Sequence, residues 1–276
     1  IWLTMPSTLQ NFQMIAESRS GTFPQITFDA IKNEEIPYPP LPEQKRISNI
    51  LSSFDNKIEL LRKENNTLED IAQSIFKEWF VKYNFPNKDG KPYRDNKGKM
   101  IDSELGLIPE GWSVRKLGNY FPIKTGKRNA NHAQENGEYN FFTCSQSATF
   151  CNEYSFNASA ILLAGNGDFN LKWFRGKFDA YQRTYVLIPF EQEYLGYLFY
   201  LIQYFFKDII QGNRGSVISF LTKGMIEDFS VVEPDKKILN MATIVFQEII
   251  EDLEKNMSMI RVAEDIKQNL IKQLIL

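Results

Sequence analysis

The chain has 276 residues, of which 43% are hydrophobic and 24% charged, with a formal net charge of −2. This composition excludes a disordered chain, and the charge provides no general attraction to nucleic acid, so that any such partner would be held by local patches. No apolar run is long enough to span a bilayer and no charged-then-apolar leader opens the sequence, so we expect a cytoplasmic location and no membrane partner.

The cysteine and histidine content argues against metal or disulfide chemistry. Cys144 and Cys151 are the two cysteines in the sequence, and His132 is its single histidine. Two cysteines in a chain of this length do not make a disulfide framework, and free thiols are the expected state. The three residues lack the spacing of metal ligands. We therefore expect no metal site and no cofactor in this chain.

The first segment, residues 1–42, resembles a later part of the same chain. A constant shift of 192 residues aligns similar residues without a gap. The coinciding pairs include Ile26 and Ile218, Phe28 and Phe220, and Pro42 and Pro234. Residues 1–36 then correspond to residues 193–228, near the end of the mixed region described below. We interpret residues 1–42 as the remnant of the end of a preceding domain, with a natural N-terminal cap as the alternative.

Residues 43–83 are predicted to form one long helix. Apolar residues recur every seven positions, together with a second set four positions later. These residues are Ile47, Leu51, Phe54, Ile58, Leu61, Leu68, Ala72, Ile75 and Trp79. The prolines before Glu43 disfavour an earlier start, and neither glycine nor proline follows until after Asn84. At about 1.5 Å per residue the helix would be roughly 55 Å long, and its apolar stripe requires another helix as a partner.

Residues 84–103 are predicted to be a linker, because turn-forming residues run through the first part and there is little to bury. Residues 104–234 have a different character. Aromatic and β-branched residues are frequent from Trp112 to Val232, and glycine-containing turn signals recur at short intervals. Short strands with one helix, over residues 194–210, are the expected structure.

Residues 235–276 are predicted to form the second long helix, as the repeat of the first. The 192-residue shift places most of its apolar stripe on that of residues 43–83. The stripe contains Leu239, Phe246, Leu253, Ile260 and Leu274. Asn256 interrupts this stripe as Asn65 interrupts the first, which is typical of polar residues that set the alignment of coiled-coil helices. The expected fold class is α+β, with a globular mixed domain flanked by two long helices.

Three groups of residues in the mixed region are candidates for contacts with nucleic acid. The first surrounds Gly126, which allows close approach of the backbone, and it combines cations for phosphates with amides for base edges. Its members are Lys124, Lys127, Arg128, Asn129 and Asn131. A solvated surface loop is the alternative.

The second group is Gln182, Arg183 and Thr184, between Tyr181 and Tyr185. Glutamine can pair with adenine and arginine with guanine, and the tip of an edge strand is the competing interpretation. The third group is Asn213, Arg214 and Ser216, which follow the predicted helix. A helix C-cap explains the neighbouring glycines but not Asn213 and Arg214 together. Gly165-Asn166-Gly167-Asp168 is interpreted as a tight turn, because the spacing of a phosphate loop is absent.

The motifs resemble a known family, the specificity subunits of type I restriction-modification systems. The resemblance rests on Pro-Tyr-Pro-Pro-Leu-Pro-Glu-Gln-Lys-Arg-Ile at residues 37–47, Leu-Ile-Pro-Glu-Gly-Trp at 107–112, Lys-Leu-Gly at 116–118, and the repeated long helices. It covers nearly the whole chain. In that family two target recognition domains each read one half of a split DNA site, and two long helices pack antiparallel as a spacer between them.

The resemblance implies that residues 104–234 are one complete target recognition domain and that the chain is a half-length or truncated subunit. It implies that double-stranded DNA is one partner. The other partners would be methyltransferase subunits, through which the restriction subunit is bound. A homodimer through the long helices is a further expectation. The methyl donor, ATP and magnesium would belong to those partners, so that this chain would be a non-catalytic subunit.

Two other classes of function compete with DNA recognition. A coiled-coil scaffold or adaptor accounts for the helices but leaves the aromatic-rich domain without a role. A DNA-modifying enzyme is disfavoured, because Tyr38-Pro39-Pro40-Leu41 lacks the polar first residue of an amino-methyltransferase motif. Asp235 and Asp265 fall on one predicted helix too far apart to share a metal ion. DNA recognition accounts for both parts of the chain.

Overall fold

The computed structural model describes residues 6–19, 25–32, 38–211 and 220–275. The chain divides into two compact units, one of residues 1–66 and 254–276 and the other of residues 67–253. Two long helices, α3 (Leu41–Phe76) and α7 (Lys236–Ile275), contribute to both units. Each unit is described separately. Within the described residues, no helix is long and apolar enough to cross a membrane.

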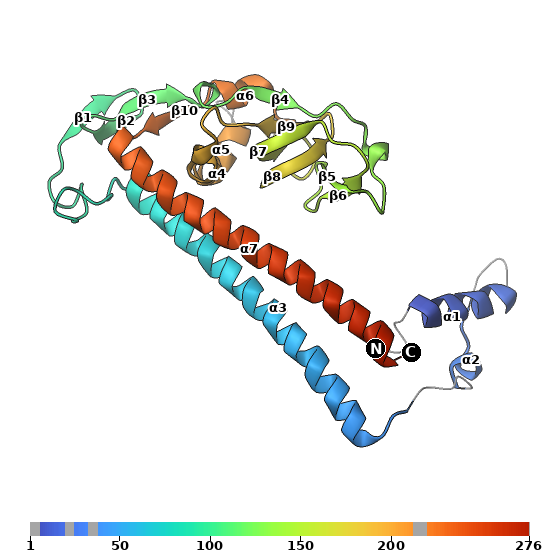
Figure 1. Ribbon diagram of the computed structural model, residues 1–276. Helices are drawn as coiled ribbons and strands as arrows, with labels where there is room; N and C mark the ends of the chain where they lie inside the picture. The colour runs from blue at the N-terminus through green and yellow to red at the C-terminus, as the bar shows by residue number, and fades with distance from the viewer. Residues whose placement is uncertain (1–5, 20–24, 33–37, 212–219, 276) are drawn as a thin grey trace. The chain divides into compact units, whose positions relative to one another are not determined.

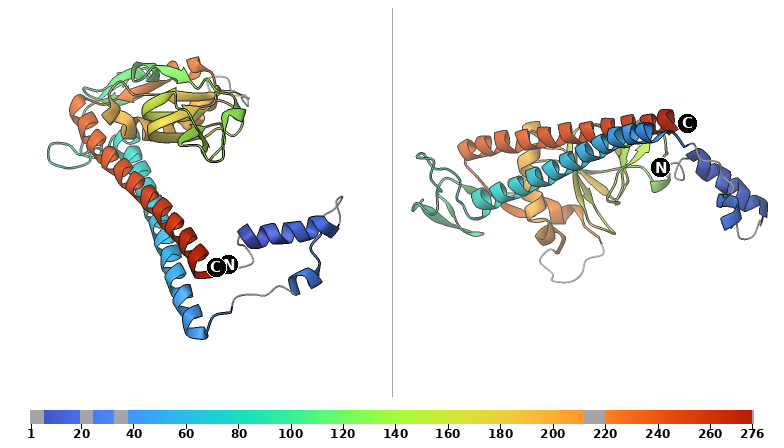
Figure 2. Two further views of the ribbon diagram at one scale, coloured as in Figure 1. Left: turned by 45° about the vertical axis from the view of Figure 1, so that its right-hand side comes forward. Right: turned by 90° about the horizontal axis from the view of Figure 1, so that it is seen from below.

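The two predicted long helices are present and run antiparallel. In the first unit, Arg62 of α3 pairs with Glu264 of α7 at 2.8 Å and Asp55 pairs with Lys267. Residue numbers therefore fall along α7 as they rise along α3, and Figures 1 and 2 show the helices side by side. The fold class expected from the heptads, a mixed domain with two long antiparallel helices, is confirmed.

The heptad stripe of α3 faces inward. Leu51, Ile58 and Leu61 are buried in the first unit. Asn65 and Asn256, which interrupt the two stripes, also lie inward, and Asn65 Oδ1 and Asn256 Nδ2 are buried without a hydrogen-bond partner among the described residues. The helix starts at Leu41, two residues before the expected Glu43, since proline is tolerated in the first turn of a helix. It ends at Phe76 and continues as a π-helical turn, Lys77–Val81.

The first unit also contains two short helices, α1 (Pro6–Arg19) and α2 (Phe28–Lys32). The 192-residue shift aligns α1 with residues 198–211. This segment and α5 (Phe206–Gln211) of the second unit share their last residue, Gln211. The shift likewise places α2 on residues 220–224, which overlap α6 (Lys223–Glu227). Under this shift the two short helices overlap in part with helices of the second unit, and the interpretation of residues 1–42 as a remnant of a preceding domain stays a prediction.

A six-stranded mixed sheet forms the centre of the second unit, with strand order β4-β9-β7-β8-β5-β6. The strands are β4 (Ile123–Thr125), β5 (Tyr139–Phe142), β6 (Thr149–Cys151), β7 (Phe156–Ala164), β8 (Leu171–Ala180) and β9 (Thr184–Leu187). Strand β5 runs parallel to β8, and the other neighbours are antiparallel. Two smaller sheets pair β1 (Met100–Ser103) with β2 (Gly106–Pro109), and β3 (Ser113–Lys116) with β10 (Ser230–Glu233).

Both faces of the sheet are covered, which explains why β7 ends in five consecutive buried apolar residues, Ala160 to Ala164. Successive side chains of a strand point to opposite faces. Ile161 and Leu163 accordingly enter the main core with the long helices, whereas Ala160 and Leu162 enter a smaller core with Phe178.

Helix α4 (Leu195–Tyr204) lies in the main core, with eight consecutive residues buried from Leu195 to Ile202. Gly196 allows it to approach α7, because a Cβ at this position would lie 2.8 Å from the carbonyl oxygen of Phe246. The one helix predicted over residues 194–210 is broken near Phe205, and α5 follows it. Asp235 caps α7 by accepting a 3.0 Å hydrogen bond from the amide of Ile238, at the predicted helix start.

Residues 84–99 form an ordered loop, not the linker with little to bury that the turn-forming residues suggested. Phe85 is buried, and its ring stacks on Trp112 with ring centroids 4.9 Å apart. The turn-forming residues shape a compact loop, and the aromatic residues fix it to the core.

The pH dependence of stability is expected to report on Glu69, a partly buried residue of α3 whose side chain interacts with Tyr200 of α4. Burial raises the pKa of Glu69 above its ordinary value of 4.5, and Glu69 Oε2 is buried without a hydrogen-bond partner among the described residues. A carboxyl group whose pKa is raised in the folded state stabilises the fold at pH values below its ordinary pKa. This stabilisation is lost as the pH rises through the raised pKa. Glutamine carries no charge, so Glu69→Gln should be at least as stable as the unchanged protein at about pH 8. Any gain in the stability of the variant over the unchanged protein should disappear near pH 4.

Urea unfolding at a series of pH values measures this difference. Glu64→Gln, an exposed change on the same helix, is the matched control. Parallel profiles of Glu69→Gln and the unchanged protein would contradict the role given to the buried carboxyl group.

Candidate nucleic-acid interface

The structure brings the first two groups of candidate residues together at one end of the six-stranded sheet. Strand β4 pairs with β9 so that Thr125 lies opposite Tyr185. The loop that follows β4 therefore leaves the sheet beside the turn that precedes β9. This proximity depends on pairing between segments that are distant in the sequence.

Gly126 allows the loop to lie directly on the neighbouring backbone. Its amide donates a 3.1 Å hydrogen bond to the carbonyl of Thr184, and a Cβ at this position would lie 2.0 Å from the carbonyl oxygen of Ala180. Further along, the amide of Gln182 donates to the carbonyl of Arg128 at 2.9 Å. The loop and the turn are thus held together through main-chain contacts, which require glycine at residue 126.

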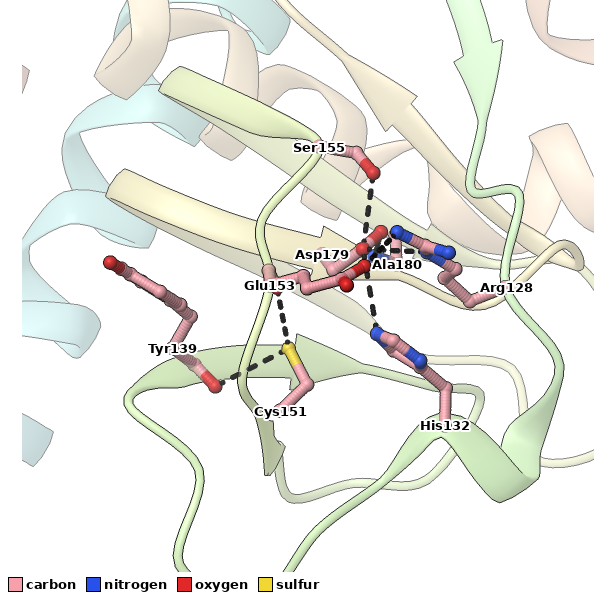
Figure 3. A network of polar contacts seen from close by, with 8 residues as sticks. All are labelled: Arg128, His132, Tyr139, Cys151, Glu153, Ser155, Asp179 and Ala180. Atoms are coloured by element: carbon pink, nitrogen blue, oxygen red, sulfur yellow. Dashed lines mark hydrogen bonds and ion pairs between the residues drawn. The ribbon is translucent and has the colours of Figure 1, made fainter.

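A buried carboxylate, Asp179, ties the loop to the end of β8. Its side chain is 0% exposed, and its Oδ2 accepts hydrogen bonds from Arg128 Nε at 3.2 Å and Ser155 Oγ at 3.0 Å. The amide of Ala180 donates to Oδ1 at 2.8 Å. His132 Nε2 lies 3.8 Å from Oδ2, so the loop approaches Asp179 at two points (Figure 3). This network fixes the path of the loop.

Arg128 consequently has a structural partner that the sequence did not suggest. The hydrogen bond to Asp179 is the main cause of a raised pKa for the Arg128 guanidinium, so this group stays charged. A second carboxylate, Glu153, pairs with it from the exposed side. Of the candidate cations, Arg128 is therefore held inside the protein network, with its side chain 38% exposed.

Six other candidates have exposed side chains at this end of the sheet. They are Lys124, Lys127, Asn129, Asn131, Gln182 and Arg183. Within the described part of the chain, their side-chain nitrogen and oxygen atoms have no hydrogen bond or ion pair to the protein. Cationic, guanidinium and amide groups are thus left available on a frame fixed by main-chain hydrogen bonds.

Thr184 differs from these residues, since it is 1% exposed and its hydroxyl donates to the carbonyl of Phe142 at 3.3 Å. Burial prevents the contact with DNA predicted for it, and we assign it to the support of the turn. The third candidate group, Asn213, Arg214 and Ser216, lies outside the described residues. The described chain resumes at Phe220, which forms a β-bridge with Asn166.

Two neighbouring loops complete this end of the sheet and were not candidates from the sequence. The turn at Gly165-Asn166-Gly167-Asp168 lies beside Arg183, because the Gly165 amide donates to the Arg183 carbonyl at 2.8 Å. Cys144 joins the same group by donating from Sγ to Asn166 Oδ1 at 3.1 Å. The tight turn was predicted, but its proximity to Arg183 arises from strand pairing across the sheet.

Both cysteines are free, as expected. Burial raises the pKa of the Cys151 thiol, whose Sγ donates to the Glu153 carbonyl at 3.0 Å. Among the described residues, no group of three or more histidine, cysteine, aspartate or glutamate side chains is arranged to hold a metal ion.

Comparison with known proteins gives a consistent family assignment. Residues 3–70 and 109–270 match the family described as the type I restriction modification DNA specificity domain. The type I restriction enzyme EcoDI specificity subunit of Escherichia coli is 43% identical over 129 residues, which cover 47% of this chain and 29% of that protein. The MjaIX specificity subunit of Methanocaldococcus jannaschii is 28% identical over 94% of this chain and 63% of its own length. The chain thus spans less than two thirds of these relatives.

A solved structure gives the same result for the fold. The type I restriction-modification system S subunit from M. genitalium aligns over 99% of this chain and 74% of its own chain, with a TM-score of 0.60. The sequence identity is 17%, so this likeness concerns the fold alone.

Proposed function

Because this chain belongs to the type I restriction-modification DNA specificity family, we propose that it is a non-catalytic subunit that reads half of a bipartite DNA site. The observation that carries the proposal is the set of exposed, unpaired side chains at the end of the sheet around Gln182 and Arg183. Guanidinium and amide groups can read base edges in the major groove, and the lysines can hold phosphates.

Each group of the interface has a separate role in this proposal. Arg183 and Gln182 would contact guanine and adenine, while Lys124 and Lys127 would contact phosphates. Asn129 and Asn131 supply further amides beside them. Arg128 orders the loop through Asp179, and Asn213, Arg214 and Ser216 remain proposed contacts outside the described residues.

The long helices would set the spacing between half sites and dock the methyltransferase subunits, through which a restriction subunit joins. The methyl donor, ATP and magnesium would be bound by those partners. An apolar groove of about 420 Å³ between α3 and α7 in the first unit supports helix-mediated association. Phe54, Val262 and Ile266 line it, and the last two are 53% and 43% exposed. A second copy of the chain is the proposed occupant, which would supply the other half-site reader.

Replacement of Arg183 tests the reading of bases. Arg183→Ala should weaken binding to the recognised duplex by about 1 to 3 kcal/mol and relax specificity at one base pair, because a bidentate contact to guanine is lost. Equilibrium titrations with the recognised duplex and its single-base variants measure both effects. Lys207→Ala removes an exposed cation of α5 and serves as the control. An equal loss on all sequences would instead identify Arg183 as a phosphate contact.

A further inference from the structure

A second concentration of positive charge lies in the ordered loop of residues 84–99, which the interface described above does not include. The loop contains five cations, Lys88, Lys91, Arg94, Lys97 and Lys99, and two carboxylates, Asp89 and Asp95, in a chain whose net charge is −2. It follows the π-helical turn and precedes β1, and lies beyond the β1–β2 hairpin, away from the six-stranded sheet (Figures 1 and 2).

Aromatic stacking fixes this loop to the core. The ring of Phe85 lies between Trp112 and Tyr93, with centroid distances of 4.9 and 4.6 Å. Gly98 packs directly on the Tyr93 ring, since a Cβ there would lie 2.3 Å from a ring carbon. The Tyr93 hydroxyl donates to the Lys99 carbonyl at 2.8 Å. Both halves of the loop are thus anchored around one aromatic ring.

Hydrogen bonds from asparagine side chains order the rest of the loop. Asn87 Oδ1 accepts from the amides of Asp89 at 2.9 Å and Lys91 at 3.0 Å. Asn84 Nδ2 donates to Asp95 Oδ2 at 3.0 Å, so that this carboxylate is used within the loop. These contacts replace the backbone ladder that a helix or strand would provide.

The backbone is also strained at one residue just before the loop and at one residue within it. Tyr83 and Lys97 adopt left-handed conformations, with φ of 61° and 63°. Such angles are unfavourable for residues other than glycine, most of all for bulky ones, and persist where the surrounding contacts impose them. A solvated linker would relax, whereas this loop is held in one conformation.

The loop presents its positive charge to solvent. Lys88, Lys91, Arg94 and Lys97 are exposed, and within the described part of the chain none of the four forms an ion pair. Lys99 differs, because it pairs with Glu110. Four like charges held on a rigid loop repel one another, and a polyanion removes that repulsion. The regular row of charges on a DNA backbone has this chemistry.

We propose that the loop of residues 84–99 binds the phosphate backbone of duplex DNA outside the recognised bases. The proposal rests on the chain being a DNA-binding subunit. Because the loop lies away from the sheet that carries Arg183, its contacts would add affinity that is independent of sequence. Point-charge lysines on a preorganised loop suit this task, since phosphates occur at every base pair.

The test uses the full chain and a labelled random-sequence duplex of about 40 base pairs, so that no recognition site needs to be known. The loop variant combines Lys88→Gln, Lys91→Gln, Arg94→Gln and Lys97→Asn, where asparagine is chosen because it tolerates the left-handed backbone. A matched control removes four exposed cations elsewhere, through Lys207→Gln, Lys237→Gln, Lys255→Gln and Lys272→Gln. Binding is measured over a series of salt concentrations.

The loop variant should lower the slope of log affinity against log salt by about 0.9 for each phosphate contact removed, so by roughly 2 to 4 in total, whereas the control should leave it unchanged. Asp89→Lys provides an independent check that keeps all five cations of the loop. Asp89 is exposed, and a lysine there should steepen the slope by about one.

An unchanged slope in both loop variants would overturn the proposal. The loop variant could keep the salt dependence of DNA binding of the unchanged protein and yet fail to bind a purified methyltransferase subunit. The loop would then be a docking surface for an acidic face of a protein. Selection from a random DNA pool separates this outcome from failure of the proposed function. A loop without phosphate contacts leaves motif enrichment intact, whereas a chain that reads no bases enriches nothing even if the slope changes.

Discussion

Arg128→Ala is expected to destabilise the protein, because it leaves the fully buried side chain of Asp179 without the guanidinium that donates a hydrogen bond to it. Ser155 and the Ala180 amide would remain as its hydrogen-bond donors, but neither carries a charge. The conformation of the loop after β4 should loosen at the same time. Urea unfolding of the variant measures the loss of stability.

A double-mutant cycle separates the ion pair from other effects of truncation. Asp179→Asn removes the buried charge, so the double variant Arg128→Ala, Asp179→Asn should be more stable than Arg128→Ala alone. Lys127→Ala, which removes an exposed neighbouring cation, is the control and should change stability by less than about 0.5 kcal/mol. Additive losses in the double variant would contradict the coupling of Arg128 to Asp179.

Gly126→Ala is expected to separate the loop after β4 from the turn before β9. The new Cβ would lie 2.0 Å from the Ala180 carbonyl oxygen, a rigid backbone atom, so the loop has to move away. The hydrogen bond from the Gln182 amide to the Arg128 carbonyl would then break. We expect a cost of roughly 3 kcal/mol from overpacking and lost hydrogen bonds, together with a large loss of DNA affinity.

Hydrogen exchange locates this effect. The amides of Arg128 and Gln182 should lose protection in Gly126→Ala, while amides of β7 stay protected. Gly224→Ala is the matched control, because a Cβ there meets only a side-chain oxygen of Asp228 at 3.8 Å in a helix, where alanine is favoured over glycine. Retained protection at Arg128 and Gln182 would show that the close contact does not control the loop.

The long helices were predictable because their pattern is local and repeated. Heptads identify α3 and α7, the 192-residue shift relates them, and Asp235 marks the start of the second. The family resemblance carried by the motifs at residues 37–47 and 107–112 is confirmed by the family match. These features depend on residues close together in the sequence, or on a comparison of the chain with itself.

The assembly of the interface was not predictable in the same way. Arg128 and Asp179 are far apart in the sequence, and the pairing of β4 with β9 that brings the candidate groups together is non-local. The boundary between the turn and β9 was also not located, so Thr184, the buried first residue of β9, was included with the exposed turn residues Gln182 and Arg183. In residues 84–99, Phe85 and Tyr93 were the available signals for an ordered loop, but the turn-forming residues outweighed them.

The central claim is that the chain selects a DNA sequence, and selection from a random duplex pool tests it most directly. The purified chain would be used with and without a methyltransferase subunit from the same source, at two salt concentrations. Our account predicts enrichment of a motif of roughly three to five base pairs, or of two copies at a fixed gap if the chain dimerises. Absence of any enriched motif, even with the partner subunit present, would contradict it and favour a scaffold built on α3 and α7.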